Sequence, residues 1–313
     1  MSASLLERYR ELLPLSETTP LVTLGEGGTP LIRAERLSQR LGVDLWLKWE
    51  GANPTGSFKD RGMAVAVSKA LEAGAPGVVC ASTGNTAASA AAYAARAGLE
   101  AVIVHAAGAV AGAKLMQVRA AGARLQAVEG TFEDAFAASL ALAERDGFTV
   151  VNSTNPHRLE GQKTAAFEIV EQLGEPPAVL ALPYGGGGNT TAYLKGFVEA
   201  GGPLPRIVPV QAAQRRETVA SAIRIADPVH ARTVQEAVDG TGGAVVTVDD
   251  GEIAAAWRSV ATVEGLFCEP ASAAPVAALE RGIAALGETI VCVLTGHGLK
   301  DPDSFERLIE AAG

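Results

Sequence analysis

The fold of this chain is decided by the stretch Asn53-Pro54-Thr55-Gly56-Ser57-Phe58-Lys59-Asp60-Arg61-Gly62. Its proline and first glycine are turn formers, and they end the strand-like run at 44–50. Ser57 and Asp60 stand three residues apart, close to a capping-box spacing, ahead of the apolar run 63–71. The pattern predicts a strand, a turn and then a helix with Lys59 in its first turn.

A lysine at this end of a helix has an unusual position, because the helix macrodipole disfavours an ammonium group there. Lys59 is therefore either turned into solvent or used as a neutral amine. A neutral amine attacks an aldehyde to form a Schiff base. The stretch alone leaves both interpretations open.

Composition restricts the class of protein. The 313 residues allow two domains, and the apolar fraction of 48% indicates a globular chain. A net charge of −9 and a pI near 5.1 argue against nucleic acid or an anionic membrane as the main partner. Small anions stay possible, because local cations and backbone N–H groups bind them regardless of net charge.

The cysteines and histidines predict no metal centre. Cys80, Cys268 and Cys292 lie in apolar runs without a CxxC spacing, which indicates buried thiols in a reducing compartment. The four histidines are isolated. With no signal-like segment and no apolar run that could span a bilayer, we expect a cytoplasmic protein without a membrane partner.

Short apolar runs alternate with helical patterns along the whole chain. The runs are 78–80, 101–104, 124–128, 148–151, 179–182, 207–210 and 289–294, and the helical patterns include 86–97, 132–145, 159–173 and 253–264. This alternation predicts an α/β fold with mainly parallel sheets. Ligands of such folds bind at the carboxyl ends of strands.

The first unusual strand-to-helix connection spans residues 80–86. Ser82, Thr83 and Thr86 supply hydroxyls, and free helix amides beside them suit a carboxylate or a phosphate. Ordinary helix capping is the alternative. Asn85 exceeds what capping needs and could bond a ligand.

The second connection contains four consecutive glycines, Gly185, Gly186, Gly187 and Gly188, followed by Asn189. Such a run costs chain entropy, which suggests that the backbone approaches a ligand closely. A phosphate held by successive N–H groups is the natural candidate. The spacing fits neither a nucleotide P-loop nor a dinucleotide fingerprint. The alternative is a flexible surface loop.

The third connection, 151–163, begins with Asn152 and Ser153 and carries Arg158 and Lys163 in the first turns of the next helix. Both cations stand at the end that the dipole disfavours, and a bound anion would remove that conflict. Two solvated surface cations are the alternative.

A last site follows the strand at 289–294. Thr295 would present its hydroxyl from the strand's carboxyl end, and His297 is either catalytic or a satisfied loop histidine. A Schiff-base lysine, a phosphate cup and a partner for a ring nitrogen together suggest pyridoxal 5'-phosphate. A hydroxyl at that nitrogen leaves the pyridine largely unprotonated, which suits eliminations better than transamination.

The motifs at 53–62, 82–89, 152–164 and 294–302 resemble those of the threonine synthases, which are fold-type II pyridoxal-phosphate enzymes similar to the tryptophan synthase β chain. Gly28-Thr29-Pro30-Leu31 and Glu269-Pro270-Ala271-Ser272-Ala273 also match, so the resemblance runs nearly end to end. It implies two three-layer α/β/α domains. Residues 51–150 would form a small domain inserted into a large one made of 1–50 and 151–313, with the cofactor between them.

The resemblance also implies a reaction, in which O-phospho-L-homoserine and water become L-threonine and phosphate. Lys59 would bond to the cofactor aldehyde and carry protons. The other cofactor contacts would be Asn85 at the ring hydroxyl, Gly185, Gly186, Gly187, Gly188 and Asn189 at the phosphate, and Thr295 at the ring nitrogen. The substrate contacts would be Ser82, Thr83, Thr86, Asn152, Ser153 and Arg158. A homodimer is implied as well.

Three features depart from the family pattern: Gly186-Gly187 stand where an asparagine is usual, Ala109 stands where a lysine is usual, and the 211–216 segment is shortened. The glycine run is more like that of threonine or serine dehydratases. A dehydratase or a phosphoserine-using synthase is therefore one alternative, and a catalytically silent, phosphate-sensing binding protein is another. Against a dehydratase, Thr86 stands where those enzymes usually have histidine.

Overall fold

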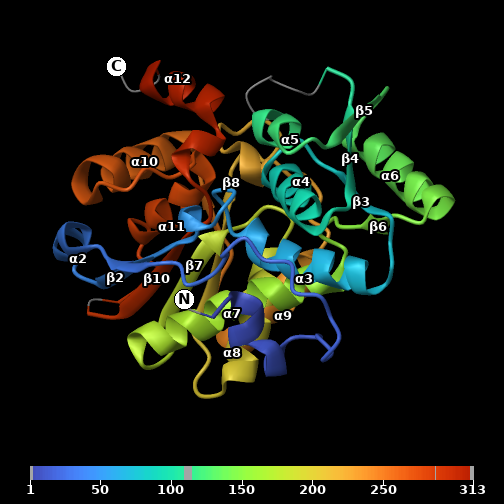
Figure 1. Ribbon diagram of the computed structural model, residues 1–313. Coiled ribbons are helices and arrows are strands. Elements are labelled where there is room, and N and C mark those ends of the chain that lie inside the picture. The colour runs from blue at the N-terminus through green and yellow to red at the C-terminus, as the bar shows by residue number, and fades with distance from the viewer. Residues whose placement is uncertain (1–2, 109–114, 286, 311–313) are drawn as a thin grey trace. The chain divides into compact units, whose positions relative to one another are not determined.

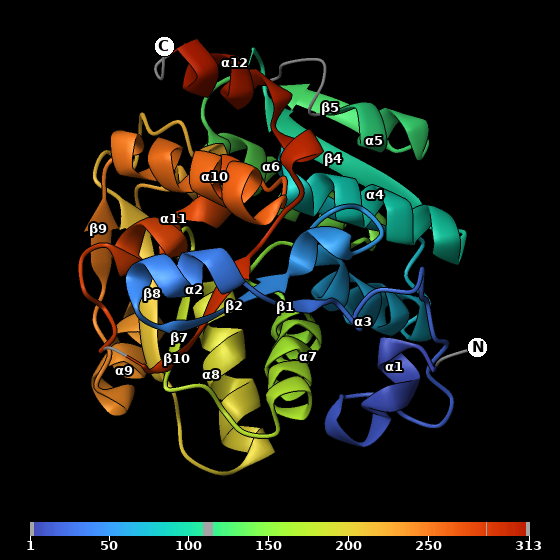
Figure 2. The same ribbon diagram turned by 90° about the vertical axis from the view of Figure 1, so that its left-hand side faces the viewer.

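The computed structural model describes residues 3–108, 115–285 and 287–310. Internal contacts divide the chain into two compact units (Figures 1 and 2). Unit 1 comprises Met1–Gly27 and Asn53–Thr164, and unit 2 comprises Gly28–Ala52 and Ala165–Gly313. Each unit has a sheet of its own.

Unit 2 contains a six-stranded sheet in the order β1-β2-β10-β7-β8-β9, parallel except for the β1–β2 pair. Its strands are β1 (Leu31–Arg33), β2 (Asp44–Trp49), β7 (Val179–Pro183), β8 (Arg206–Ala212), β9 (Val246–Val248) and β10 (Thr289–Leu294). On β10, Ile290 and Cys292 belong to one core cluster, whereas Val291 and Val293 belong to another. Both faces are buried, which explains the unbroken apolar runs.

Helices cover both faces of this sheet (Figure 2). One core cluster includes residues of α2, α10, α11 and α12, and the other includes residues of α7 and α8. The bounds are α2 (Glu35–Leu41), α7 (Pro156–Leu173), α8 (Gly188–Ala200), α9 (Ala231–Thr241), α10 (Asp250–Glu264), α11 (Pro270–Leu279) and α12 (Pro302–Glu310), with 3-10 turns η2 (Glu50–Ala52), η4 (Ser221–Ile223) and η5 (Gly298–Lys300). Unit 2 is thus an α/β/α sandwich.

Unit 1 contains a four-stranded parallel sheet in the order β5-β4-β3-β6. Its elements are α1 (Leu5–Arg8), η1 (Arg10–Leu12), α3 (Lys59–Glu72), β3 (Gly77–Ala81), α4 (Asn85–Ala97), β4 (Glu100–Ala106), α5 (Met116–Ala120), β5 (Arg124–Val128), α6 (Phe132–Asp146) and β6 (Thr149–Val150). Helix α6 packs on one face of the sheet and α4 on the other (Figure 1). The predicted α/β architecture with mainly parallel sheets is confirmed.

The local predictions had mixed outcomes. The predicted strands at 124–128 and 289–294 coincide with β5 and β10. Strands β1 and β9 were missed because three residues are too few to give a periodic signal. The capping box between Ser57 and Asp60 is wrong, since α3 has no side-chain cap. The Asp60 carboxylate instead accepts hydrogen bonds of 2.6 Å from the Thr55 N–H and hydroxyl.

The unit boundaries differ from the predicted domain boundaries, because residues 1–27 and 151–164 group with the central segment. The Tyr93 hydroxyl donates to Glu26 (2.7 Å), which attaches the N-terminal segment to α4. The first half of α7 packs closely on α3. A Cβ on Gly161 would overlap the Arg61 carbonyl and lie 2.7 Å from the Gly62 Cα.

This backbone contact predicts that Gly161→Ala destabilises the protein. The added methyl has no room, so overpacking should cost about 2 kcal/mol of unfolding free energy. Gly240→Ala is the matched control, since it also lies in a helix but has nothing within 4 Å of the added Cβ. The free energy of unfolding of Gly240→Ala should rise by up to about 1 kcal/mol, because alanine has the higher helix propensity. Denaturant unfolding measures both, and equal stabilities would contradict the close contact.

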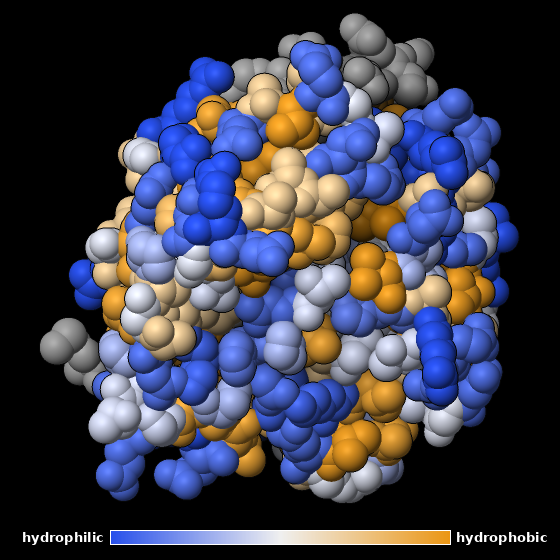
Figure 3. All heavy atoms as spheres, turned by 90° about the vertical axis from the view of Figure 1, so that its right-hand side faces the viewer, coloured by the Kyte–Doolittle hydropathy of each residue, from blue (hydrophilic) through white to orange (hydrophobic). Residues whose placement is uncertain are grey.

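The surface mixes polarities. On the face shown in Figure 3, hydrophobic side chains are interspersed with hydrophilic ones. None of the described helices is both long and apolar enough to cross a membrane.

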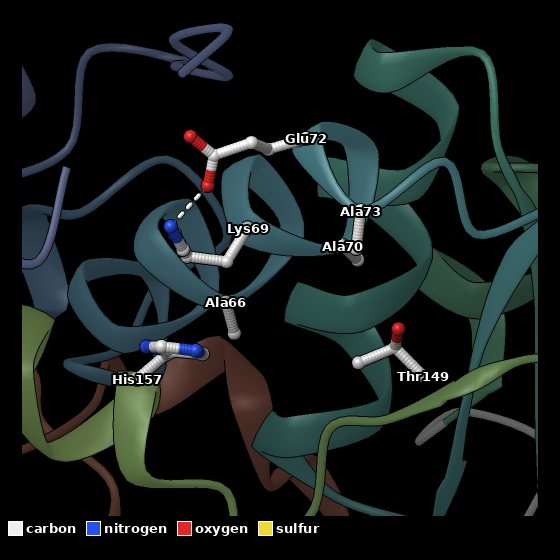
Figure 4. A pocket seen from close by; sticks show the side chains of 7 residues that line it. All are labelled: Ala66, Lys69, Ala70, Glu72, Ala73, Thr149 and His157. Carbon is white, nitrogen blue, oxygen red and sulfur yellow. Dashed lines mark hydrogen bonds and ion pairs between the residues drawn. The ribbon is translucent and has the colours of Figure 1, made fainter. Parts of the chain in front are cut away.

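Glu72, near the end of α3, holds the N-terminal segment. Its carboxylate accepts hydrogen bonds from the hydroxyls of Ser16 (2.6 Å) and Thr19 (2.5 Å). It also pairs with Lys69 (Figure 4). These contacts, the Lys69 bond foremost, lower the pKa of Glu72 to about 2.

A pH-dependent stability difference follows. A carboxylate with a depressed pKa stabilises the fold above its unfolded pKa, and this stabilisation is lost as pH falls through the folded value. Glu72→Gln should therefore lower the melting temperature at pH 7, and the difference from wild type should shrink as pH falls from 4.5 towards 2. Glu17→Gln, at an exposed position in the same segment, is the control. A difference that is constant with pH would contradict the assignment.

Candidate functional site

Lys59 is the first residue of α3, so its predicted place in the first helical turn is confirmed. Its ammonium nitrogen lies 4.3 Å from the centroid of the Phe58 ring, and its side chain is half-buried. A ring face attracts a cation without forming an ion pair. The amine is thus held close to the turn that precedes α3.

The connection after β3 offers helix amides without a side-chain cap. Helix α4 starts at Asn85, and its N-cap is Gly84. The Ser82 hydroxyl accepts from the Gly84 N–H (3.2 Å) and does not cap the helix. Ordinary capping, the alternative for this stretch, is therefore wrong for α4. Thr83 and Thr86 are half-buried beside these amides, an arrangement that suits a carboxylate.

The connection after β6 lies beside the one after β3, because β3 and β6 are parallel neighbours. The Asn152 amide accepts from the Ala81 N–H and donates to the Ala81 carbonyl, both at 3.0 Å. Asn152 thereby joins the carboxyl ends of the two strands. Ser153 follows it and is half-buried.

Arg158, in the first turn of α7, is 1% exposed. One guanidinium nitrogen, Nη1, donates to the Val151 carbonyl (3.0 Å). Within the described residues, Nε and Nη2 have no hydrogen-bond partner. Burial lowers the pKa of Arg158 to about 10, so the group is still charged at neutral pH. A buried cation without an ion-pair partner is costly, and a bound anion would compensate it.

Lys163 is 2% exposed, and its ammonium pairs with Glu160 (2.6 Å). The surface-cation alternative is therefore wrong for both Arg158 and Lys163. Lys163 has its own counter-charge. Arg158 remains the cation of this pair whose free donors suit an anionic ligand.

Phosphate should therefore bind at Arg158. A saturating anion, at a hundredfold above its Kd, should add about 2.7 kcal/mol to the stability of the cofactor-loaded protein. In Arg158→Met the added stability should disappear, although stability without phosphate should be equal or higher, since an unpaired buried ion is removed. Calorimetric melting with and without inorganic phosphate measures this, and an equal gain in both proteins would contradict it.

In unit 2, the glycine run follows β7 and leads into α8. Gly187 is the N-cap of α8, with φ +86°, and a Cβ there would lie 2.7 Å from a Val234 methyl. Only glycine fits this backbone. The side-chain nitrogen of Asn189 and the hydroxyl of Thr190 are buried and have no partner within the described residues. An uncapped helix start with two such polar atoms fits a phosphate group.

Thr295 follows β10 and is 4% exposed. Its hydroxyl is 3.0 Å from the Ser272 hydroxyl and 3.4 Å from a Glu269 carboxylate oxygen. Glu269 is the N-cap of α11, and Pro270 is its first residue.

His297 is a structural loop residue. Its Nδ1 accepts from the Leu299 N–H (3.2 Å), and its ring packs against Phe267 (centroids 6.0 Å apart). Burial, with a smaller contribution from the charge of Lys300, lowers the pKa of His297. These contacts favour the loop-histidine interpretation over the catalytic one.

Strands β10, β7 and β8 are parallel neighbours, so their carboxyl ends lie along one edge of the sheet. Thr295 follows β10, and the glycine run follows β7. The sequence analysis missed two residues near this edge. They are Thr190, whose hydroxyl has no partner in the part of the chain that the structure describes, and Arg215, which follows β8. The signal for Arg215 was its place after a strand adjacent to β7.

A hollow of about 310 Å³ in unit 1 contains none of the predicted site residues. It is lined by Ala66, Lys69, Ala70, Glu72, Ala73, Thr149 and His157 (Figure 4). Its Lys69 is already paired with Glu72. We assign it no part in the chemistry.

The family model described as pyridoxal-phosphate dependent enzyme matches residues 22–296. The chain belongs to this family. Threonine synthase from Halalkalibacterium halodurans is 49% identical over 98% of this chain and 92% of its own length. Threonine synthase from Mycobacterium leprae is 48% identical over 95% of this chain and 88% of its own.

Solved structures of pyridoxal-phosphate enzymes share the fold. The processed form of threonine deaminase isoform 2 from Solanum lycopersicum superposes with a TM-score of 0.80 at 27% identity, over 91% of this chain and 88% of its own. Maize serine racemase gives 0.79 at 22% identity, over 91% and 92%, which shows the fold alone. The predicted fold-type II architecture and the pyridoxal-phosphate dependence of the family are confirmed. Ala109 lies outside the described residues.

Proposed function

We propose that this chain is a threonine synthase, a lyase that converts O-phospho-L-homoserine and water to L-threonine and phosphate. Curated threonine synthases at 48–50% identity, and one from Methanosarcina acetivorans at 43%, support this activity. When bound, pyridoxal phosphate withdraws electrons from the carbons of an amino acid joined to it. The protein supplies binding, orientation and proton transfer.

The observation that carries the proposal is the buried Arg158 guanidinium, whose Nε and Nη2 lack partners within the described residues. A substrate phosphate supplies the charge that this site lacks. Since Arg158 is 1% exposed, the phosphate reaches it only after a local rearrangement. Ser153 and Asn152 lie on the same connection and complete this proposed phosphate subsite, although the Asn152 amide is bonded to Ala81 in the structure.

The remaining unit 1 residues have distinct proposed roles. Lys59 would hold the cofactor through its aldehyde and would move protons at the α and β carbons of the substrate. Ser82, Thr83 and Thr86 bind the substrate carboxylate at the uncapped start of α4. Asn85 bonds the ring hydroxyl of the cofactor.

Unit 2 supplies the proposed anchors of the cofactor. Gly185, Gly186, Gly187, Gly188 and Asn189 hold its phosphate through N–H groups and the Asn189 amide. Thr295 faces its ring nitrogen. The buried, unpartnered Asn189 nitrogen and the uncapped start of α8 support the first assignment. The buried Thr295 hydroxyl at the end of β10 supports the second.

Incubation of the pure protein with O-phospho-L-homoserine tests the function. We expect threonine and inorganic phosphate in equal amounts, with both lost in Lys59→Ala. A keto acid formed from threonine, without turnover of the phosphorylated substrate, would assign a dehydratase, which the Gly186-Gly187 run resembles. If the protein shows neither turnover nor visible cofactor absorbance, the remaining alternative is the catalytically silent, phosphate-sensing binding protein.

We also propose that the protein is a cytoplasmic homodimer. The family resemblance supports the dimer, and three buried, unpaired cysteines support a reducing compartment. Light scattering after size exclusion should give twice the chain mass of 32.0 kDa. The monomer mass would contradict the dimer.

A further inference from the structure

We propose that Arg215 is a positioning residue, which orients the glycine loop, Tyr184 to Gly187, so that its N–H groups face the cofactor phosphate. The inference rests on the proposed function, in which this loop holds that phosphate. Arg215 lies three residues beyond the end of β8, and the loop follows β7, its parallel neighbour.

The Arg215 side chain contacts two residues of the loop and the neighbouring Ile225. Its guanidinium carbon lies 4.4 Å from the centroid of the Tyr184 ring, a cation–π contact. Its Nη1 donates to the Gly185 carbonyl (3.4 Å) and to the Ile225 carbonyl (2.9 Å). Ile225 itself packs against the loop, since a Cβ on Gly185 would lie 3.2 Å from its terminal methyl.

The other edge of the guanidinium is fixed as well. Nε and Nη2 both donate to the Gln211 side-chain oxygen, at 3.0 and 2.6 Å. Gln211 donates in turn to the Thr247 hydroxyl (2.9 Å). Because a planar guanidinium bonded along two edges cannot turn, the direction of its bond to Gly185 is fixed.

That bond sets the direction of the next N–H group. In a planar trans peptide, the carbonyl and the following N–H point in opposite directions. With the Gly185 carbonyl held by Arg215, the Gly186 N–H points away from it. The Gly186 carbonyl accepts from the His230 N–H (3.0 Å), so the Gly187 N–H is turned by the same geometry.

Neither of these two N–H groups donates to an acceptor within the described residues. Successive N–H groups of this kind form an anion-binding concavity. They lead directly into the start of α8, which has no side-chain cap and where the Asn189 side-chain nitrogen likewise has no partner among the described residues. Arg215 and the His230 N–H therefore preset the loop for a phosphate, and Arg215 is the contact that a substitution can remove.

The test compares pyridoxal phosphate with pyridoxal, which lacks the phosphate. Full-length apoprotein is titrated with each compound and followed by visible absorbance. Arg215→Gln should weaken binding of pyridoxal phosphate about tenfold, the usual effect of losing a charge-assisted bond, and leave pyridoxal binding unchanged. Arg215→Lys should not restore affinity, since an ammonium lacks the planar fork. Arg216→Gln, at the exposed neighbouring position, is the matched control.

Gln211→Met provides a second variant that keeps Arg215 but removes its acceptor. It should show the same phosphate-selective loss at smaller magnitude, about threefold. Equal losses for both compounds, or full rescue by lysine, would overturn the positioning role. If the wild-type protein binds pyridoxal as tightly as pyridoxal phosphate, the loop does not hold the phosphate and the proposed function of the loop fails instead.

Discussion

The backbone contact between α3 and α7 is the constraint on which unit 1 depends. Gly62 and Gly161 let the two helices touch without side chains between them, since a Cβ on Gly62 would lie 2.5 Å from the Arg158 carbonyl. The same contact places the start of α3, with Lys59, in one unit with the start of α7, with Arg158. The Lys59 amine and the buried Arg158 guanidinium are thus positioned by two glycines that have no side-chain chemistry of their own.

In unit 2, buried side chains hold backbone groups in fixed orientations. Buried Lys48 donates to the Thr29 carbonyl (2.9 Å) and to Glu168 (2.8 Å), and Glu168 accepts from the Gly28 N–H (2.7 Å). An ion pair this deeply buried stabilises little by itself, but it holds the turn at Gly28 in one conformation. In the glycine loop, the Gly185 carbonyl accepts from Arg215 and the Gly186 carbonyl accepts from the His230 N–H.

Family membership and residue-level structure support the proposed activity from different directions. Identity near 49% to curated threonine synthases concerns the chain as a whole. The departures Gly186 and Gly187 are local. Gly186 has no positive φ, and a Cβ there would make an ordinary contact of 3.7 Å with the Ile225 terminal methyl, so the backbone there does not require glycine. Gly187 does, because its φ is positive and Val234 packs against it.

The sequence by itself determined the α/β class, the parallel sheets and the place of Lys59 in the first turn of α3. These are local properties: hydrophobic periodicity, turn residues and helix polarity act within about ten residues. Tertiary structure decided what depends on distant partners. It buried Arg158 with no ion-pair partner among the described residues, engaged Asn152 with Ala81, and brought Arg215 to Gly185 across two neighbouring strands. No local pattern contains these features, because each depends on segments that only the fold brings together.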